Sequence, residues 1–358
     1  MNKIDYIVVG QGLVGTLVAF SLLQRGKSIK VIDNNHRHAA SKVAAGIINP
    51  VTGKKYVKSW KIDKLIPEAR EIYTALENQL EEVFLTDRNM LRVLPNNKSV
   101  NNWEVRKTDP LYDNYIARDT SQDPFPDHIR KKHGWGEVTN ALHVHLPKLI
   151  AKYSTYLKRE NLLVEEGFNY EELVASDYGW RYNQTEARQV IFCEGYKAHT
   201  LNPYFSYLPF QPAKGEAVFV RLADSSINKM LKDREFLLHI EDNLYWSGGG
   251  YDWTELNEIP TKEFYIQWKK HIEELLKVEF SKEEHIAGVR PSVTDRRPMV
   301  GRHPTHKNLI ICNGMGTKGT SLAPYCIKNL LGHLEEQDAL DKEIDVARFE
   351  NLFVNSTV

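Results

Sequence analysis

The sequence is poor in cysteine, has no net charge and contains no long hydrophobic run. Its three cysteines, Cys193, Cys312 and Cys326, form no metal-binding spacing, and an odd, sparse set favours a reducing compartment. Lys plus Arg equal Asp plus Glu at 47 each, which argues against a global electrostatic grip on nucleic acid or anionic membrane. The longest apolar runs, such as residues 6–9 and 309–312, fall far short of the roughly 20 residues of a membrane helix. We therefore expect a cytoplasmic protein with no transmembrane segment and no metal.

The length and composition indicate a folded protein of about two domains. The chain has 358 residues, and a domain commonly takes roughly 100–200 residues. It is 42% hydrophobic and 26% charged, as ordinary globular proteins are and disordered chains are not.

The first 33 residues follow the pattern of a nucleotide-binding unit. An apolar strand at residues 7–9 ends in the glycine-rich loop 10–15, a helical pattern follows and closes at Gly26, and a second strand at residues 29–32 ends at Asp33. In such a unit Gly10 permits the tight turn, Gly12 lets the backbone approach a pyrophosphate, and Gly15 lets the helix pack on the strand. The helix N-terminus attracts the phosphates, and Asp33 accepts hydrogen bonds from the ribose. The cofactor contacts predicted here are Gly10, Gly12, Leu13, Val14, Gly15, Asp33 and Asn34.

The unit by itself leaves open whether the dinucleotide is FAD or NAD. The small residues that follow it offer backbone that can lie close to a flat ring, and an ordinary loop leading to a helix is the alternative. We expect contacts there from Ser41, Ala44, Ala45 and Gly46. Farther along, a buried strand at residues 189–192 runs into Gly195, where a cofactor can pass over a strand end.

Hydrophobic spacing predicts the remaining elements. Helical patterns occupy residues 63–83, 146–157, 263–278 and 321–334, and strand patterns occupy residues 216–220, 235–240 and 244–247. The polar stretch 88–133, punctuated by Asn, Asp, Pro and Gly, predicts short strands and loops.

Taken in order, these motifs resemble the FAD-dependent D-amino-acid oxidase superfamily, which includes glycine oxidase, sarcosine oxidase and the oxidase module of a bifunctional tRNA wobble-uridine enzyme. The order is the N-terminal unit, the Ser-x-x-x-x-Gly loop at residues 41–46, the strand and glycine at 190–195, the segment 209–216, Gly-Val-Arg-Pro at 288–291 with 295–301, and the glycine-rich loop 313–319. The resemblance covers nearly the whole chain.

The resemblance implies an α/β protein whose Rossmann-like FAD-binding domain is interleaved with an α+β substrate domain built on a mostly antiparallel sheet. Residues 1–85, 137–205 and 286–358 are expected to form the FAD-binding domain. Residues 86–136 and 206–285 are expected to form the substrate-binding domain, so the chain leaves the first domain and returns to it.

The resemblance also implies how FAD is held. The C-terminal loop would bring backbone N–H groups to flavin O2 and N1, with contacts from Gly314, Gly316, Thr317, Lys318 and Gly319. The charge of Lys318 would act near flavin or substrate, unless it is an ordinary surface lysine. FAD is expected to be non-covalent, because no cysteine stands near residues 290–291, where the sarcosine-oxidase branch attaches it.

Arg290 is the residue we single out for the substrate. In the glycine-oxidase branch an arginine in the same Gly-x-Arg-Pro context clamps the substrate carboxylate, and Arg290 would also lie against the cofactor. The alternative is a structural ion pair with Asp295 or another buried acid. His239 and Tyr251 are weaker candidates for the flavin face, and packing or simple hydrogen bonding is the alternative for each.

The implied reaction is oxidative deamination of a small amine or amino acid, by hydride transfer from the substrate Cα to flavin N5 without an enzyme base. The electron acceptor would be oxygen or a quinone, and oxygen is in doubt because residues 245–247 read Tyr-Trp-Ser where the sarcosine-oxidase branch keeps a lysine. The alternatives are a flavin dehydrogenase serving a quinone or carrier protein, an oxidase of a modified tRNA base, a non-catalytic flavoprotein and an NAD-dependent reductase. Zero net charge makes a nucleic-acid partner unexpected.

Overall fold

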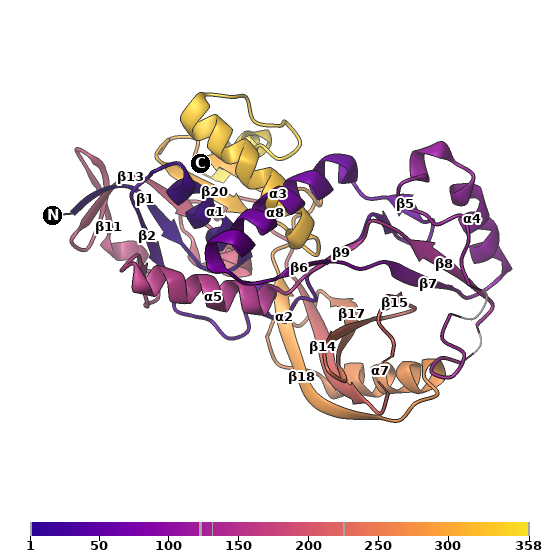
Figure 1. Cartoon of the computed structure of the whole chain (residues 1–358). Helices are drawn as coiled ribbons and strands as arrows, with labels where there is room; N and C mark the ends of the chain where they lie inside the picture. The colour runs from indigo at the N-terminus through magenta and orange to yellow at the C-terminus, as the bar shows by residue number, and fades with distance from the viewer. Residues whose placement is uncertain (1, 122–123, 131, 225, 357–358) are drawn as a thin grey trace.

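Two large β-sheets lie side by side, each covered by helices on one face (Figure 1). The computed structural model describes residues 2–121, 124–130, 132–224 and 226–356. Within that part of the chain no helix is both long and apolar enough to cross a bilayer. The three cysteines are buried and free.

The first sheet has eight strands in the order β10-β2-β1-β13-β12-β11, with β20 joined to β13 and β19 to β20. Its central pairings, β10 with β2, β2 with β1, β1 with β13 and β13 with β20, are all parallel. The strands are β1 (Asn2–Val9), β2 (Ile29–Ile32), β10 (Leu163–Val164), β11 (Leu173–Ser176), β12 (Gly179–Tyr182), β13 (Thr185–Phe192), β19 (Met299–Arg302) and β20 (Leu309–Asn313).

Four long helices cover one face of this sheet: α1 (Leu13–Gln24), α3 (Ile62–Leu80), α5 (Leu146–Arg159) and α8 (Gly319–Leu331). They share one core cluster with Tyr6 and Val8, whereas Ile7 and Val9 of the same strand pack into a second cluster on the opposite face. Alternate side chains of β1 therefore pack into two hydrophobic cores, one on each face of the sheet. The predicted strand–loop–helix–strand unit is confirmed as β1, α1 and β2.

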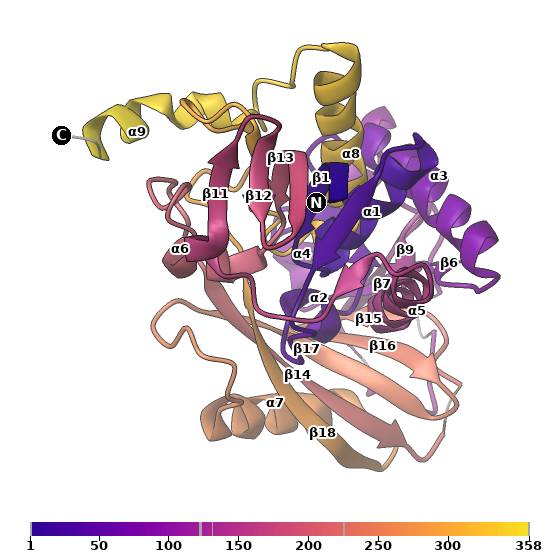
Figure 2. The ribbon, with the colours of Figure 1, turned by 90° about the vertical axis from the view of Figure 1, so that its left-hand side faces the viewer.

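The second sheet has seven strands in the order β18-β14-β17-β16-β15-β7-β8, antiparallel except between β15 and β7. Helix α7 (Lys262–Leu275) covers its outer face through Trp268, Ile272 and Leu275 (Figure 2). The strands are β7 (Met90–Leu94), β8 (Gly134–Val138), β14 (Ala213–Leu222), β15 (Met230–Lys232), β16 (Phe236–Glu241), β17 (Leu244–Asp252) and β18 (Phe280–Arg290).

Smaller elements complete the chain. Two small sheets are formed by β3 (Ile47–Ile48), β9 (Leu142–Val144) and β6 (Leu85–Asp87), and by β4 (Val51–Thr52) and β5 (Val57–Lys58). The short helices are α2 (Ala40–Val43), α4 (Asn97–Lys107), α6 (Ala198–Leu201) and α9 (Glu350–Ser356). Single turns are the 3₁₀ segments η1 (Pro110–Tyr112), η2 (Tyr170–Glu172), η3 (Gly195–Lys197) and η5 (Val346–Phe349), and the π-helical η4 (Gly332–Glu336).

The predicted fold class is confirmed: a Rossmann-like sheet is interleaved along the chain with a mostly antiparallel one. The predicted domain boundaries stay a prediction. Strand β18 runs without a break through residues 285 and 286, where one boundary was drawn, so a single strand spans both predicted domains.

The expectation of only strands and loops across residues 88–133 is wrong, because this stretch contains helix α4. The helix buries one side chain, Trp103, so its sequence carries no apolar stripe. Asn96 caps it by accepting a hydrogen bond from the Ser99 backbone N–H at 3.0 Å. Trp103 packs edge-on against Tyr56 and over Gly136, where a Cβ would lie 2.2 Å from the indole. Tertiary packing thus overrides weak helix propensity.

Candidate functional site

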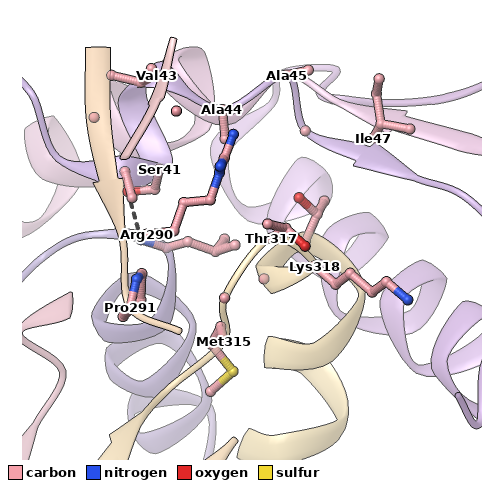
Figure 3. Close-up of a pocket in the computed structure, with 18 of the residues that line it drawn as sticks. Ser41, Val43, Ala44, Ala45, Ile47, Arg290, Pro291, Met315, Thr317 and Lys318 are labelled. Atoms are coloured by element: carbon pink, nitrogen blue, oxygen red, sulfur yellow. Dashed lines mark hydrogen bonds between the residues drawn. The ribbon is translucent and has the colours of Figure 1, made fainter. Parts of the chain in front are cut away.

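A cavity of about 1550 Å³ lies where the two sheets meet. Its wall is built from the end of β1, the start of α1, residues 39–47, the end of β13, the ends of β17 and β18, and the loop before α8. Figure 3 shows the part formed by residues 41–47, the end of β18 and the loop before α8. Small-molecule pockets commonly measure roughly 300–1,000 Å³. The cavity therefore has room for an extended cofactor together with a second ligand.

The N-terminus of α1 opens into this cavity without a side-chain cap or an acidic residue in its first turn. The first backbone N–H of the helix, on Leu13, donates a hydrogen bond to the Ser41 hydroxyl from the neighbouring segment at 3.3 Å. Gly15 lies behind the loop, where a Cβ would stand 1.7 Å from the Gly10 carbonyl oxygen, so only glycine lets the helix approach the strand this closely. Free N–H groups and a positive helix end suit a phosphate group.

Asp33 lines the cavity at the end of β2. One carboxylate oxygen accepts the Gln11 backbone N–H at 2.7 Å, and the other accepts that of Asn35 at 2.6 Å. The backbone thus fixes the carboxylate next to the glycine loop, and its remaining lone pairs can accept hydrogen bonds from ribose hydroxyls.

A second helix N-terminus, that of α8, opens into the same cavity, also without a side-chain cap or an acid in its first turn. The preceding loop is tied to the end of β13, because the Asn313 side-chain amide donates to the Gly195 carbonyl at 2.8 Å. Lys318 stands at the helix start and lines the cavity, and its pKa is lowered by burial and then by the charge of Arg297. Two positive helix ends therefore face one cavity, as a dinucleotide with an anionic flavin ring requires.

Arg290, the last residue of β18, projects into the cavity (Figure 3). It donates to the carbonyl oxygens of Gly250 at 2.8 Å and Lys214 at 3.3 Å and lies over the Tyr251 ring at 4.8 Å. Burial lowers its pKa. Among the described residues it has no carboxylate partner, and Asp295 pairs with Arg348 instead at 2.9 Å. Donors thus remain for an acidic ligand, and the alternative of a structural pair with Asp295 is wrong.

Of the other two substrate candidates, Tyr251 lies at the cavity and His239 does not. Tyr251 lines the cavity, 55% exposed, with its ring stacked on Trp253. His239 is not among the lining residues; its ring bonds to the Asp242 carbonyl oxygen at 2.7 Å, and its own carbonyl accepts from Arg88. We therefore propose no contact between His239 and the substrate.

Most predicted contacts line the cavity, and a few lie behind it. The lining residues are Gly10, Gly12, Leu13, Val14, Asp33, Asn34, Ser41, Ala44, Ala45, Gly46, Gly195, Tyr251, Arg290, Gly316, Thr317, Lys318 and Gly319. The residues that do not line it are Gly15, His239 and Gly314. Gly314 has a φ of +80°, and a Cβ on it would stand 2.7 Å from the Val293 side chain. Within the described ranges, no group of three or more His, Cys, Asp or Glu is placed to hold a metal ion.

Sequence reasoning missed several charged residues on the cavity wall, among them Glu194, Arg92 and Lys232. Glu194 accepts hydrogen bonds from the Tyr170 hydroxyl and, at 2.7 Å, from the Asn202 amide, and burial raises its pKa to about 7. Arg92 and Lys232 were detectable as single cations inside the apolar strand patterns of residues 90–94 and 230–232.

Comparison with known proteins agrees with this geometry. The family model described as DAO, FAD dependent oxidoreductase, matches residues 5–330. Glycine oxidase from Geobacillus kaustophilus superposes with a TM-score of 0.80 at 17% identity, covering 98% of each chain. Iminodiacetate oxidase from Chelativorans sp. BNC1 has a TM-score of 0.78 at 17% identity, covering 96% of this chain and 98% of that one. L-Proline dehydrogenase from P. horikoshii has a TM-score of 0.76 at 18% identity, covering 98% of each.

Proposed function

This chain belongs to the DAO family of FAD-dependent oxidoreductases, and from that premise we propose that it oxidises the C–N bond of a small amine or amino acid that carries a carboxylate. The observation that carries the proposal is Arg290, a largely buried guanidinium in the cavity with no acidic partner among the described residues. A guanidinium binds a carboxylate through two parallel hydrogen bonds, so it fixes both position and orientation.

The residues of the cavity fit FAD. The open start of α1 suits the pyrophosphate, Asp33 suits the ribose, and the open start of α8 suits the electron-rich edge of the flavin ring. When bound, FAD supplies the two-electron acceptor of the reaction. We propose non-covalent binding, since Cys312 and Cys326 do not line the cavity and burial raises the pKa of Cys193, which does line it and therefore stays a thiol.

In this proposal the protein acts by positioning and by electrostatics. Arg290 holds the substrate carboxylate, which sets the Cα–H bond toward the cofactor. The α8 N-terminus, with Lys318 beside it, stabilises the negative charge that develops on the cofactor side. The substrate loses two electrons and two protons and becomes an imine, which water hydrolyses to a carbonyl compound and ammonia or an amine.

The domain division and the location are proposals too. Residues 1–85, 137–205 and 286–358 are proposed as the FAD-binding part, which the strand membership of the first sheet supports. A cytoplasmic location is proposed on the sparse cysteines alone.

The test begins with the purified protein, which should be yellow and should release FAD on acid treatment. Anaerobic addition of glycine, D-amino acids, sarcosine or proline should bleach the flavin. Arg290→Lys keeps the positive charge but loses the planar guanidinium that makes two parallel hydrogen bonds. It should raise KM for carboxylate substrates by about tenfold or more. Protein that holds FAD and is bleached by no amine would instead support a non-catalytic flavoprotein.

The electron acceptor is tested separately. Trp246, in the stretch where relatives keep a lysine, donates its indole N–H to the Val43 carbonyl at 3.0 Å and contributes no charge to the cavity wall. Turnover in air, compared with anaerobic turnover on a soluble quinone, distinguishes an oxidase from a dehydrogenase.

A further inference from the structure

Two basic side chains, Arg92 on β7 and Lys232 on β15, lie next to each other on the cavity wall. Their Cα atoms are partners in the parallel pairing of the two strands, so both side chains point to the same face of the sheet. The residues just before them, Leu91 and Leu231, pack into the core under α7 on the other face. Arg92 and Lys232 therefore face away from α7 and into the cavity.

Arg92 lacks an acidic partner among the described residues. Its terminal nitrogens have only long contacts, 3.5 Å to the Val51 carbonyl and 3.4 Å to that of Gly53, and its charge lies 5.0 Å from the Tyr56 ring centroid. Its Nε is buried and has no hydrogen-bond partner in the described part of the chain. Burial lowers its pKa. A buried donor without a partner costs stability unless a ligand satisfies it.

Burial also disfavours the charged form of Lys232. Its ammonium donates to the Arg234 carbonyl oxygen and lies 4.4 Å from the Phe236 ring centroid. Burial, and after it the charge of Arg92, lowers its pKa to about 8. Two like charges side by side in a partly buried wall repel each other, and this repulsion is relieved by an anion between them.

The charges of Asp233 and Glu235 raise the pKa of Lys232 against the effects of burial and Arg92, and each acid also has another basic partner. Asp233 pairs with Lys132 at 3.8 Å, and Glu235 pairs with His271 at 3.3 Å. Along residues 49–56, 92–106 and 232–236 of the cavity wall Asp233 is the single acid, whereas the cations besides Arg92 and Lys232 are Lys54, Lys55, Lys98, Arg106 and Arg234. Among these described residues seven cations thus stand against one acid, which gives this end of the cavity a positive potential.

We propose that Arg92 and Lys232 form a second anion-binding site, which takes an acidic group at the end of the substrate remote from the oxidised amine. The inference rests on the proposed amine oxidation, and it narrows the substrate class to amines with a distal carboxylate or phosphate. The guanidinium supplies a planar fork of donors and the ammonium a point charge, and both suit either oxyanion.

The sheet order gives the scale of that substrate. Five strand steps separate β18, with Arg290, from β7, with Arg92. At about 4.8 Å per step the two strands lie ~24 Å apart across the sheet, and the long side chains of both residues, which line one cavity, shorten the gap between the charges. Glycine engages the Arg290 end alone, and an extended amino acid is needed to reach both ends.

The kinetic test uses the FAD-loaded protein and a series of amino acids with a terminal carboxylate, from aspartate to longer homologues. O-phosphoserine is the phosphate probe, and glycine, which has no side-chain acid, is the reference. We expect KM to fall along the acidic series. Lys232→Met and Arg92→Met should raise KM for the acidic substrates roughly 10- to 100-fold and leave KM for glycine unchanged. Lys64→Met, which removes an exposed charge on α3 outside the cavity wall, is the matched control. An equal change for glycine and the acidic substrates, or no preference for acidic ones, overturns the proposal.

A thermal measurement tests the site without turnover. Inorganic phosphate, compared with chloride at equal ionic strength, should raise Tm of the wild type and of Lys64→Met but not of Lys232→Met. Without phosphate, Lys232→Met should melt above the wild type, because the repulsion from Arg92 is gone. A phosphate shift that persists in both Lys232→Met and Arg92→Met refutes the site. If no amine bleaches the flavin, the proposed function fails while this measurement still decides the anion site.

Discussion

Replacing Gly215 by alanine should displace the Arg290 guanidinium while leaving Arg290 itself unsubstituted. Gly215 lies on β14 beside Arg290, and a Cβ built there stands 1.9 Å from Nη2, 2.2 Å from Cζ and 2.7 Å from Nη1 of the guanidinium. The atoms that must yield form the far end of a flexible side chain, so we expect Gly215→Ala to fold and to retain FAD. An ordinary contact begins near 3.4 Å, so the guanidinium must retreat by about 1.5 Å.

That displacement sets the expected size of the effect. A shift of about 1 Å in a positioning group can cost about 100-fold in rate. We therefore expect kcat/KM for amino acids to fall by about 100-fold in Gly215→Ala, equivalent to about 2.7 kcal/mol. An amine without a carboxylate makes no use of the clamp, so its kcat/KM should stay within about threefold of the wild-type value.

The decisive assay is a double-mutant cycle with Arg290→Ala. If Gly215→Ala acts only by moving the guanidinium, it has no further effect once that guanidinium is absent. FAD content and Tm, measured on the same preparations, separate loss of the clamp from loss of the fold. Equal losses for amino acids and for the amine without a carboxylate, or additive losses in the double variant, would refute the clamp.

Three further substitutions test the fold and the cofactor site. Gly15→Ala places a Cβ 1.7 Å from the Gly10 carbonyl oxygen, a backbone atom that cannot swing away, so the purified variant should be colourless; a yellow variant with wild-type FAD content contradicts this. His143 is 5% exposed, and burial lowers its pKa to about 3. The folded state therefore binds fewer protons than the unfolded state between pH 6.5 and 3, and stability falls as the pH drops through that range, by about 2 kcal/mol at pH 5. Urea unfolding at pH 7 and pH 5 should show this loss in the wild type and a smaller one in His143→Gln, and equal losses would exclude the effect. Gly136→Ala forces a Cβ to within 2.2 Å of the buried Trp103 indole and should cost about 1–3 kcal/mol in the free energy of unfolding, whereas an unchanged urea midpoint would show that the indole can move.

The parts of the protein that follow local rules were predictable. The unit β1–α1–β2 is written within 33 consecutive residues, because strand, glycine loop, helix and acid each have a local signature. Arg290 was found through its neighbours in the sequence. Helix α4 was not predicted, because it is held in place by one indole, that of Trp103, which packs on residues far away in the chain.

The candidate site likewise has features that local sequence predicts and features that only the tertiary structure shows. Gly12 and Asp33 follow from the local strand–glycine loop–helix–strand motif, and Lys318 was predicted from the resemblance of its glycine-rich loop to that of the D-amino-acid oxidase superfamily. That Arg290 has no acidic partner among the described residues, and that Arg92 and Lys232 lie side by side, depends on the pairing of strands distant in the chain. Burial and neighbouring charges set the energy of an ionised group, and both are properties of the assembled sheets. The sequence alone therefore determined the nucleotide-binding unit and the chemical types of the site residues, and the tertiary structure decided which charges remain without partners for a ligand.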